Sequence, residues 1–545
     1  MPALLQHEAA KLAQERWQDG KNERSHHEQD WEELAVYMRG PSRGGFVSAE
    51  PGRDRNIKAL TSAPIIAQMN FSAGLYGTLV NPANKWMGLE LGGYGSDKSQ
   101  DVREWEALAS RVILNSFKPA ISPFYSQVMP LFHDISTFGN ACDYDELEPG
   151  TRRIMDVTLS LAEVVYFIDA FGRVVELVRR MMLKPAQAAD WMGYENLPPK
   201  LQEKAQARSQ DKHAFFQHVG RNREYEARAL GPNGRRYFSR ICTEVENALI
   251  RTRGYDEMPF RTPRWDVDTG QTYGYGPGSV ALPDGRIATR MDDAVIRSAQ
   301  FNADPVKLAP DREVWPHTGV WRPGSTIYGA VNAQGNAMIR TIEKSPGVGL
   351  TQEQYAQRIE NVKDAFFSNL MQLAGRSGMS ATEVIERQEE KLRLMAPNIG
   401  RIQDEYLSPK IARRFQLLWR AGQIPPPPEG AKGRPMNIVY QSGASMAQKS
   451  AEGAALSRLL QDVTPLVQMD PEGKGRRILD RINADDMLEA FQEARGADPR
   501  VLRSRQDADQ AAEARQPQQD LAAGIDLAQG GARALRDVAA AEAAA

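Results

Sequence analysis

The most regular pattern of hydrophobic and polar positions in this chain follows residue 350. Large apolar residues recur there at spacings of four, three, four, four and three: Tyr355, Ile359, Val362, Phe366, Leu370 and Leu373. This spacing places them on one face of an α-helix. Thr351 and Gln354 form a capping box at its start, because the hydroxyl and the amide each satisfy a free backbone N–H. We predict a helix over 351–374, roughly 35 Å long at ~1.5 Å per residue.

A second helical pattern follows a short, glycine-bounded loop. Residues 375–379 interrupt the first helix, and Ser380 with Glu383 forms another capping box. The apolar positions that follow are Ile385, Leu392, Met395, Ile399, Ile402, Tyr406, Leu407, Ile411, Phe415 and Leu418. Pro397 and Pro409 should kink this helix, because proline removes a helical N–H donor. The proline run 425–428 should end it, before a strand expected at 437–441.

The N-terminal pattern predicts two amphipathic helices within residues 3–39. Their apolar positions are Leu5, Leu12 and Trp17 in the first helix, then Trp31, Leu34, Ala35 and Met38 in the second. Residues 40–56 are glycine-rich and basic, and a helix of small residues should follow from Thr61 to Val80. Asn81 and Pro82 should end that helix.

Strand patterns dominate the middle of the chain, between 83 and 284. Short β-branched and aromatic runs alternate there with turn signals. Val164–Ile168 and Val174–Val178 are expected strands, separated by a turn at Phe171 and Gly172. We therefore predict a mixed α/β region within a protein of α+β class that is mainly α.

Two further segments lack strong periodicity. Residues 305–349 contain prolines scattered among aromatics and glycines, so we expect a small irregular module between two helices.

Residues 446–497, in the C-terminal region, should be helical. The tail beyond about 506 is rich in Ala, Gln and Asp, and it holds too few large apolar side chains to bury a core by itself.

The composition narrows the possible functions. Hydrophobic residues make up 41% and charged residues 25%, which is typical of a folded globular chain. Lys and Arg total 68 against 70 Asp and Glu, so the chain lacks the basic excess of a tight DNA binder, and any DNA contact should be loose. Cys142 and Cys242 are too few for a disulfide framework, which indicates synthesis in a reducing compartment. We expect neither a signal peptide nor a membrane span.

The sequence contains no strong catalytic motif. Residues 473–475 lack the glycine spacing and the Ser/Thr of a phosphate loop, and the proline within 274–278 removes a donor that such a loop needs, which favours a structural turn. The seven histidines show no metal-ligand spacing; His213 and His218 lie five apart on an expected helix. Cys142 has no neighbour that would activate it as a nucleophile. We expect no cofactor and no metal, although catalytic acid pairs leave no trace in one sequence.

Charged residues along the helix predicted over 351–374 allow three interpretations. They are Glu353, Arg358, Glu360, Lys363 and Asp364. A solvated helix face is the ordinary explanation; ion pairs between subunits and a charged channel wall are the alternatives. Arg376 lies in the tight loop between the two long helices, where a surface loop without a role and a functional loop are equally compatible with the residues.

Three separated clusters resemble the head-to-tail connector, or portal, family of short-tailed bacteriophages. The first cluster holds Glu15-Arg16, Trp31-x-Glu33-Leu34-Ala35-x-Tyr37 and Ala73-Gly74-Leu75-Tyr76-Gly77-x-Leu79-x-Asn81-Pro82-x-x-x-Trp86. The second is Thr272-x-Gly274-x-Gly276-Pro277-Gly278. The third runs from Phe366-Phe367-x-x-Leu370 through Met379-Ser380-Ala381-Thr382-Glu383-Val384 to Leu417-x-Trp419. The resemblance covers about 10–445; the residues beyond match only in being helical and polar.

The resemblance implies a subunit with wing, stem, clip and crown parts, assembled into a ring of about twelve copies. The implied division is residues 1–284 as N-terminal helices and α/β wing, 285–304 as first stem helix, 305–350 as clip, 351–374 as second stem helix, 375–379 as tunnel loop, 380–440 as long kinked wing helix and strand, and 441–545 as helical crown with an Ala-rich tail. The implied tunnel-loop residues at the DNA channel are Gly375, Arg376, Ser377 and Gly378. Arg358, Glu360, Lys363 and Asp364 would lie on the stem.

The implied function is that of a portal at one capsid vertex, through which double-stranded DNA is packaged and ejected. The implied partners are other copies of the chain, the DNA, the terminase motor, tail adaptor proteins, and the major capsid and scaffolding proteins, with no membrane. The chain would be made in the host cytoplasm and would function in the virion. Because the motor supplies ATP hydrolysis, no enzymatic activity is expected. The alternatives are a tail adaptor or tube ring protein and a phage DNA-processing enzyme.

Overall fold

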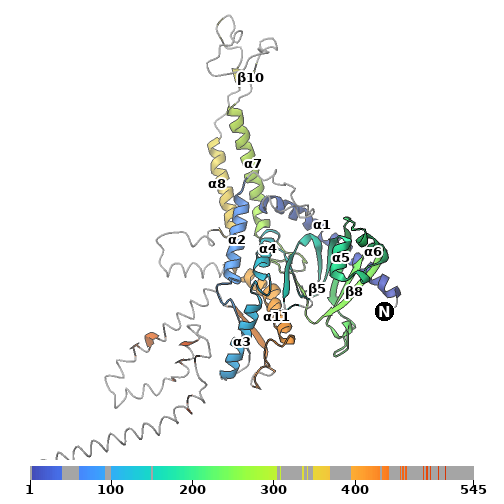
Figure 1. The fold of residues 1–545 in the computed structure, drawn as a ribbon. Helices are drawn as coiled ribbons and strands as arrows, with labels where there is room; N and C mark the ends of the chain where they lie inside the picture. Colours follow the sequence, from blue (N-terminus) through green and yellow to red (C-terminus); the bar gives the residue numbers. More distant parts are fainter. Residues whose placement is uncertain are drawn as a thin grey trace, which may run out of the picture. The chain divides into compact units, whose positions relative to one another are not determined.

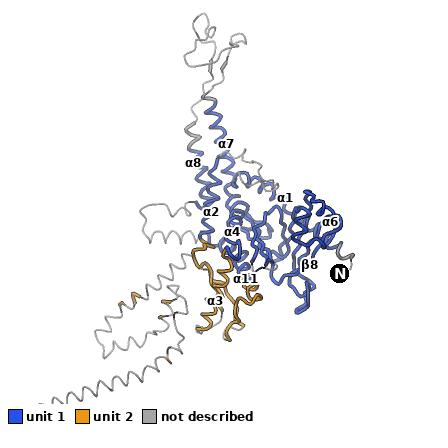
Figure 2. The backbone as a smooth tube through the Cα atoms, in the orientation of Figure 1, with its two compact units in different colours: residues 1–77, 119–413 blue, residues 78–118, 414–545 orange. Residues whose placement is uncertain are grey.

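The computed structural model describes residues 3–39, 61–92, 100–148, 153–303, 348–368, 394–429 and 433–440, with residues 151, 307–308, 340–341 and single positions elsewhere. Its two compact units, coloured separately in Figure 2, comprise residues 1–77 with 119–413 and residues 78–118 with 414–545. The helices are α1 (Ala3–Met38), α2 (Ala63–Leu79), α3 (Gln100–Ser116), α4 (Phe124–Phe138), α5 (Pro185–Met192), α6 (Pro199–Gln206), α7 (Pro277–Ala303), α8 (Val348–Ala365) and α11 (Ser408–Arg420).

The strands confirm the α+β class. They are β1 (Met87–Leu91), β2 (Cys142–Leu147), β3 (Ile154–Leu159), β4 (Val164–Ile168), β5 (Val174–Leu183), β6 (His213–Arg221), β7 (Tyr237–Thr243), β8 (Ala248–Tyr255), β9 (Phe260–Arg261), β10 (Lys307–Leu308), β11 (Arg340–Thr341) and β12 (Met436–Tyr440). The two predicted strands are confirmed as β4 and β5, and β5 continues to Leu183. The predicted helix of small residues is confirmed as α2.

The largest sheet of the first unit has five antiparallel strands in the order β4-β5-β6-β7-β8 (Figure 1). Its side chains alternate between the two faces. The core between this sheet and α1 contains Ala10, Ala13 and Trp17 of the helix and Val165, Val178, Ala214, Phe216 and Cys242 of the sheet. Towards α5 and α6, the core contains Met181, Ala188, Met192, Leu197, Leu201, Phe215, Ile241 and Ile250. Helices therefore contribute to the hydrophobic cores on both faces.

The prediction of two N-terminal helices is wrong, because α1 is one helix of 36 residues. It continues through Gly20, where a side chain would lie 2.6 Å from Cβ of Val165. A glycine inside a helix costs about 1 kcal/mol, but here it lets the helix approach the sheet closely. Trp17 and Trp31 are buried as expected, whereas Leu12 is 41% exposed.

A charged contact fastens α1 to the sheet. Arg16 donates from Nε to Glu176 Oε1 at 2.9 Å and from Nη2 to Oε2 at 2.8 Å. His218 Nε2 lies 2.8 Å from the same Oε1. Burial raises the pKa of the Glu176 carboxyl, but the hydrogen bonds from Arg16 and His218 outweigh burial and lower that pKa to about 2. The charged form of Glu176 is therefore favoured in the folded protein.

The Glu176 contact should make stability depend on acidic pH. A carboxyl whose pKa falls from 4.5 to about 2 on folding stabilises the protein fully above pH 4.5, and this contribution is lost as pH falls towards 2. Urea unfolding of the wild type and of Glu176→Gln should therefore differ in midpoint at pH 6, and the difference should shrink between pH 4.5 and 2. A difference that stays constant over that range would contradict this assignment.

His213 and His218 were expected on a helix, and this expectation is wrong, since both lie on strand β6. Five positions apart on a strand, their side chains point to opposite faces of the sheet. His213 Nε2 lies 3.2 Å from Lys204 Nζ, and His218 contacts Glu176 instead. The two rings therefore do not share one environment.

The second unit pairs β1 with β12, which confirms the strand predicted at 437–441 within one residue at each end. Helix α3 closes this pair: Ser110 Oγ accepts from Leu89 N at 2.8 Å, and Glu106 Oε1 accepts from Leu91 N at 2.6 Å. Trp105 Nε1 donates to the carbonyl of Pro425 at 2.8 Å. Segments more than 300 residues apart thus form one small core.

Both long C-terminal helices differ in detail from the prediction. Helix α8 begins at Val348, so Thr351 lies inside it and not at its N-cap. It ends at Ala365, and Phe366 and Phe367 form a turn, with a φ of 51° at Phe367. Residues 369–374, over which the prediction continued the helix, lie outside the described residues. Phe366 and Phe367 pack around Phe71 of α2, with ring centroids 6.1 Å apart in each case. The turn at the end of α8 therefore packs against α2.

A π-helical turn precedes Pro409, one of the two positions where a kink was expected. At the other, Pro397, the chain is regular helix. Residues 394–402 are helical, Gln403–Leu407 form the π-turn, and α11 follows directly. Proline has no N–H and its ring crowds the preceding turn, so a locally wider helix accommodates it. None of the helices in the described part of the chain combines the length and hydrophobicity that a bilayer crossing requires.

Candidate functional site

Helices α7 and α8 form an antiparallel pair on either side of residues 304–347 (Figure 1). Helix α7 begins at Pro277, eight residues before the expected start at 285, because a proline is well tolerated in the first turn of a helix. Arg358 Nη1 donates to Asp284 Oδ1 at 2.8 Å, and Tyr355 Oη donates to Asp292 Oδ2 at 3.2 Å. Two polar contacts thus fix the register of the pair.

The four residues expected on a stem all lie on α8, within its described part. Arg358 pairs with Asp284 of the same subunit, so its charge stabilises the helix pair. Lys363 Nζ lies 3.1 Å from Glu360 Oε2, one turn away on the same helix. Asp364 is exposed. The four residues expected in a tunnel loop, 375–378, lie outside the described residues, as do most of 305–350 and 441–545.

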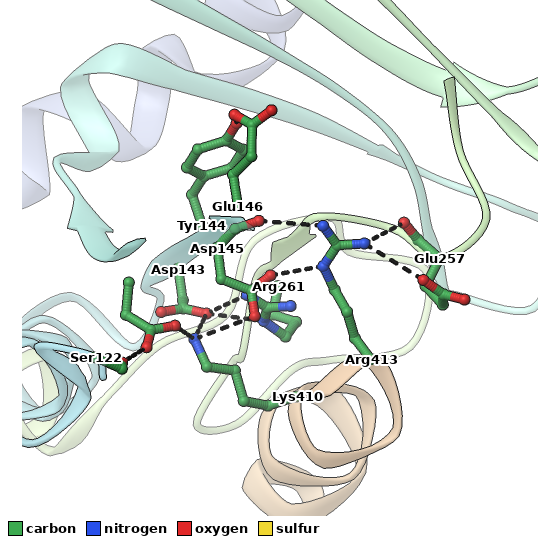
Figure 3. Close-up of polar contacts among 10 residues, drawn as sticks. Ser122, Asp143, Tyr144, Asp145, Glu146, Glu257, Arg261, Lys410 and Arg413 are labelled. Atoms are coloured by element: carbon green, nitrogen blue, oxygen red, sulfur yellow. Dashed lines mark hydrogen bonds and ion pairs between the residues drawn. The ribbon is translucent and has the colours of Figure 1, made fainter. Parts of the chain in front are cut away.

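A buried ionic cluster lies beneath α11 (Figure 3). Asp143 and Asp145 lie two apart on β2, and therefore on one face of the sheet, while Asp156 lies opposite Asp145 on β3. Lys410 and Arg413 lie one turn apart on α11 and point at these carboxylates. The cluster joins the helix to the three-stranded sheet β3-β2-β9.

The distances show that each charge of the cluster is paired. Lys410 Nζ lies 2.8 Å from Asp143 Oδ2 and 2.6 Å from Asp156 Oδ1. Arg413 Nε donates to Asp145 Oδ1 at 2.7 Å. Arg261 of β9 lies 2.6 Å from Asp143 Oδ2 and 2.9 Å from Asp145 Oδ1 through Nη2. Three buried carboxylates thus face three buried cations.

The carboxylates of the cluster stabilise the charge of Arg261. Burial lowers the pKa of Arg261, but the charges of Asp145 and Asp143 outweigh it and hold that pKa above its ordinary value. Ser122 Oγ donates to Asp156 Oδ2. The Lys410 side chain and those of Asp145 and Asp156 have no exposed surface. These ion pairs hold α11 against β2 and β3.

A second ionic contact holds the π-helical turn. Arg264 donates from Nη2 to Glu405 Oε1 at 2.7 Å and from Nε to Oε2 at 3.1 Å, a bidentate geometry. The same guanidinium donates to the carbonyl oxygens of Gly172 and Thr272. Arg264 therefore links three segments of the first unit: the β4–β5 turn, the loop before α7 and the helical segment 394–413.

Sequence reasoning missed both ionic contacts. The alternation of Asp143 and Asp145 in a strand pattern was one available signal, because acids on the inward face of a strand require partners. Lys410 and Arg413 among the apolar positions Ile411 and Leu418 were another. No local pattern connects the two signals, since Lys410 and Asp143 lie 267 residues apart.

The two cysteines are buried and free. Burial raises the pKa of the Cys242 thiol to about 12, and it raises that of Cys142 further above the ordinary value. Both thiols therefore stay protonated near neutral pH, which makes them poor nucleophiles. Among the described residues no group of His, Cys, Asp and Glu side chains is arranged to hold a metal ion.

Comparison with known proteins gives three findings. A probable portal protein of Bordetella phage BPP-1 is 26% identical over 517 residues, covering 90% of this chain and 88% of that protein. The portal protein of Salmonella phage epsilon15 is 24% identical over 493 residues, covering 88% and 86%. A solved chain from "Neck of empty GTA particle computed with C6 symmetry" covers 73% of this chain and 87% of its own length at 12% identity, with a TM-score of 0.34.

The family comparison covers more of the chain than the sequence clusters did. Residues 10–502 match the model of the family described as bacteriophage head to tail connecting protein, beyond the limit of 445 that the clusters indicated. Since the match spans most of the chain, and both phage relatives are covered almost from end to end, this chain belongs to the bacteriophage head-to-tail connecting protein family.

Proposed function

We propose that this chain is the subunit of a portal ring at one vertex of a phage capsid, through which double-stranded DNA enters and leaves. The observation that carries the proposal is the family match over residues 10–502. The antiparallel pair α7 and α8 supports it, because two rigid helices flanking residues 304–347 suit the wall of a channel. A portal subunit is a structural component of the virion.

The expected division into parts follows from this proposal. Helices α7 and α8 would form the stem, residues 305–350 the clip that meets the terminase motor and later the tail adaptors, and residues 375–379 the tunnel loop. The sheets with α1, α5, α6 and α11 would form the wing, and residues 441–545 the crown, inside a shell of capsid and scaffolding proteins. The formal charge of −2 suits a channel, since a strongly basic wall would bind each phosphate and retard sliding.

Electron microscopy of the purified protein tests the proposal directly. Class averages viewed along the particle axis should show closed rings of about twelve subunits with a hole wide enough for duplex DNA. Rings that carry a hole too narrow for a duplex would favour a tail adaptor role. Persistent monomers or dimers would contradict the portal proposal, and nuclease and ATPase assays would then test the DNA-processing alternative.

Arg376→Ala should leave ring assembly intact while reducing the amount of DNA packaged or retained. The proposed reason is that a cation repeated around the tunnel touches the phosphates transiently. DNA content per particle, measured in a packaging reaction, checks the prediction. Arg223→Ala is the matched control, because Arg223 is exposed on the loop between β6 and β7, far along the chain from the tunnel loop. Equal DNA content in both variants would remove Arg376 from the mechanism.

A further inference from the structure

Helix α7 carries an exposed stripe that the folded subunit leaves uncovered. Its members recur at spacings of three and four, as on one helix face: Val280, Pro283, Ile287, Arg290, Ala294 and Arg297. Val280 is 61% exposed and Ile287 is 37% exposed. A helix face of this kind, apolar with two cations, is suited to packing against another helix that carries acids.

Helix α8 carries the complementary stripe. Its exposed members are Glu353, Ala356, Gln357, Glu360 and Asp364, again at helical spacing. Three acids and a small alanine thus stand on α8, against two arginines and two large apolar side chains on α7. Small residues such as Ala356 let two helices approach closely, and opposite charges across the seam set the register.

The two stripes lie apart from the seam inside the subunit. That seam is marked by the contacts of Asp284 with Arg358 and of Asp292 with Tyr355, and none of these four residues belongs to a stripe. One chain therefore presents two different surfaces on its helix pair. A ring requires this arrangement, because a head-to-tail interface joins two distinct patches on successive copies.

Arg290 and Glu353 are the charges best placed to meet across such an interface. Among the described residues neither takes part in an ion pair or side-chain hydrogen bond. Arg290 precedes Asp292 by two positions and Glu353 precedes Tyr355 by two, so each lies about 3 Å along its helix from that contact. Because the two helices are antiparallel, these offsets point in opposite directions and amount to about 6 Å along the pair. A copy rotated about an axis tilted to the helix pair, and so displaced by about 6 Å along it, would bring the two charges level.

We propose that the exposed stripe of α7 in one copy packs against the exposed stripe of α8 in the next, with Arg290 paired to Glu353 and Ile287 seated on Ala356. The inference rests on the proposed ring and adds to it which surfaces of this chain join neighbours. On this basis the acids of α8 face an adjacent subunit and not the DNA.

Thiol cross-linking between two different variants tests the interface. Arg290→Cys and Glu353→Cys are made in separate chains, mixed during assembly and treated with a short bis-maleimide, because an arginine–carboxylate pair holds the two Cβ atoms farther apart than a disulfide allows. A covalent dimer should form in the mixture and in neither variant alone. Cys142 and Cys242 are buried and should not react. Arg173→Cys, at a side chain that is 65% exposed, replaces Arg290→Cys in the control mixture, which should give no dimer.

Charge reversal supplies a second readout in the assembly equilibrium. Arg290→Glu should raise the protein concentration at half assembly about tenfold, since two acids then face each other. Adding Glu353→Arg in the same chain should restore assembly. Wild-type rings without the specific cross-link, or a double reversal no better than the single one, would overturn this interface and leave the portal proposal standing. A wild-type protein that never forms rings would overturn both.

Discussion

Lys410→Met should lower the free energy of unfolding by about 3–5 kcal/mol. Methionine keeps an unbranched stem of similar length but removes the ammonium that lies 2.8 Å from Asp143 and 2.6 Å from Asp156. Three buried carboxylates would then face only Arg261 and Arg413. A buried charge without a partner has lost its hydration, and no opposite charge compensates for that loss. The midpoint of urea unfolding, followed by tryptophan fluorescence, measures the loss.

Two further variants separate the charge effect from the change of side chain. Lys200→Met makes the same substitution at a side chain that is 69% exposed and pairs with Glu246 at 3.5 Å, so it should change stability by less than about 1 kcal/mol. Adding Asp156→Asn to Lys410→Met restores the balance of two carboxylates and two cations, and should recover part of the loss. If Lys410→Met and Lys200→Met unfolded at the same midpoint, the ion pairs of Lys410 would not stabilise the fold as proposed.

Gly276→Ala should destabilise the protein by roughly 3 kcal/mol through steric overlap. A methyl group there would lie 2.6 Å from the carbonyl oxygen of Ile135 and 2.8 Å from the amide nitrogen of Gly139. Both are backbone atoms at the end of α4, where Gly139 N–H donates to that same Ile135 carbonyl at 2.9 Å. No flexible side chain can move aside, so α4 and the loop before α7 must separate.

Gly400→Ala is the matched control. Gly400 lies in the helical segment 394–402, and a side chain added there meets nothing within 4 Å. Alanine should raise stability by about 0.5–1 kcal/mol, because it restricts the unfolded chain and favours the helix. The opposite signs of the two glycine substitutions are the expected result in thermal unfolding. A stable Gly276→Ala protein would show that the two segments do not approach as closely as described.

The ionic contacts also hold in place a helix that contains a π-helical turn. Arg264 holds the π-turn through Glu405, and Lys410 with Arg413 holds the following turns of α11. The wider π-turn accommodates Pro409, and the buried pairs anchor the helix beyond it. Replacing such pairs by apolar side chains is often neutral in stability, so the specific gain here is the fixed register of α11 against β2 and β3.

The sequence by itself determined the elements whose side chains follow one local period. Residues 164–168 are a strand because β-branched and aromatic side chains fit a pleated sheet, and α2 is a helix that ends before Asn81 and Pro82. The stripe from Tyr355 to Phe366 identified α8 for the same reason, because the helical spacing of its apolar residues is visible within a short segment of the sequence. The three clusters led to the correct family, although they ended 57 residues short of its match.

Only the tertiary structure decided what depends on partners distant in the chain. Gly20 lies inside a continuous helix at the point where Val165 approaches it, and Phe366 and Phe367 at the end of α8 pack around Phe71. Arg358 was a candidate from the sequence, but its partner Asp284 was not. The cluster around Lys410 joins residues separated by more than 250 positions. Electrostatic pairing acts through space, so no periodicity along the chain records which carboxylate a given cation meets.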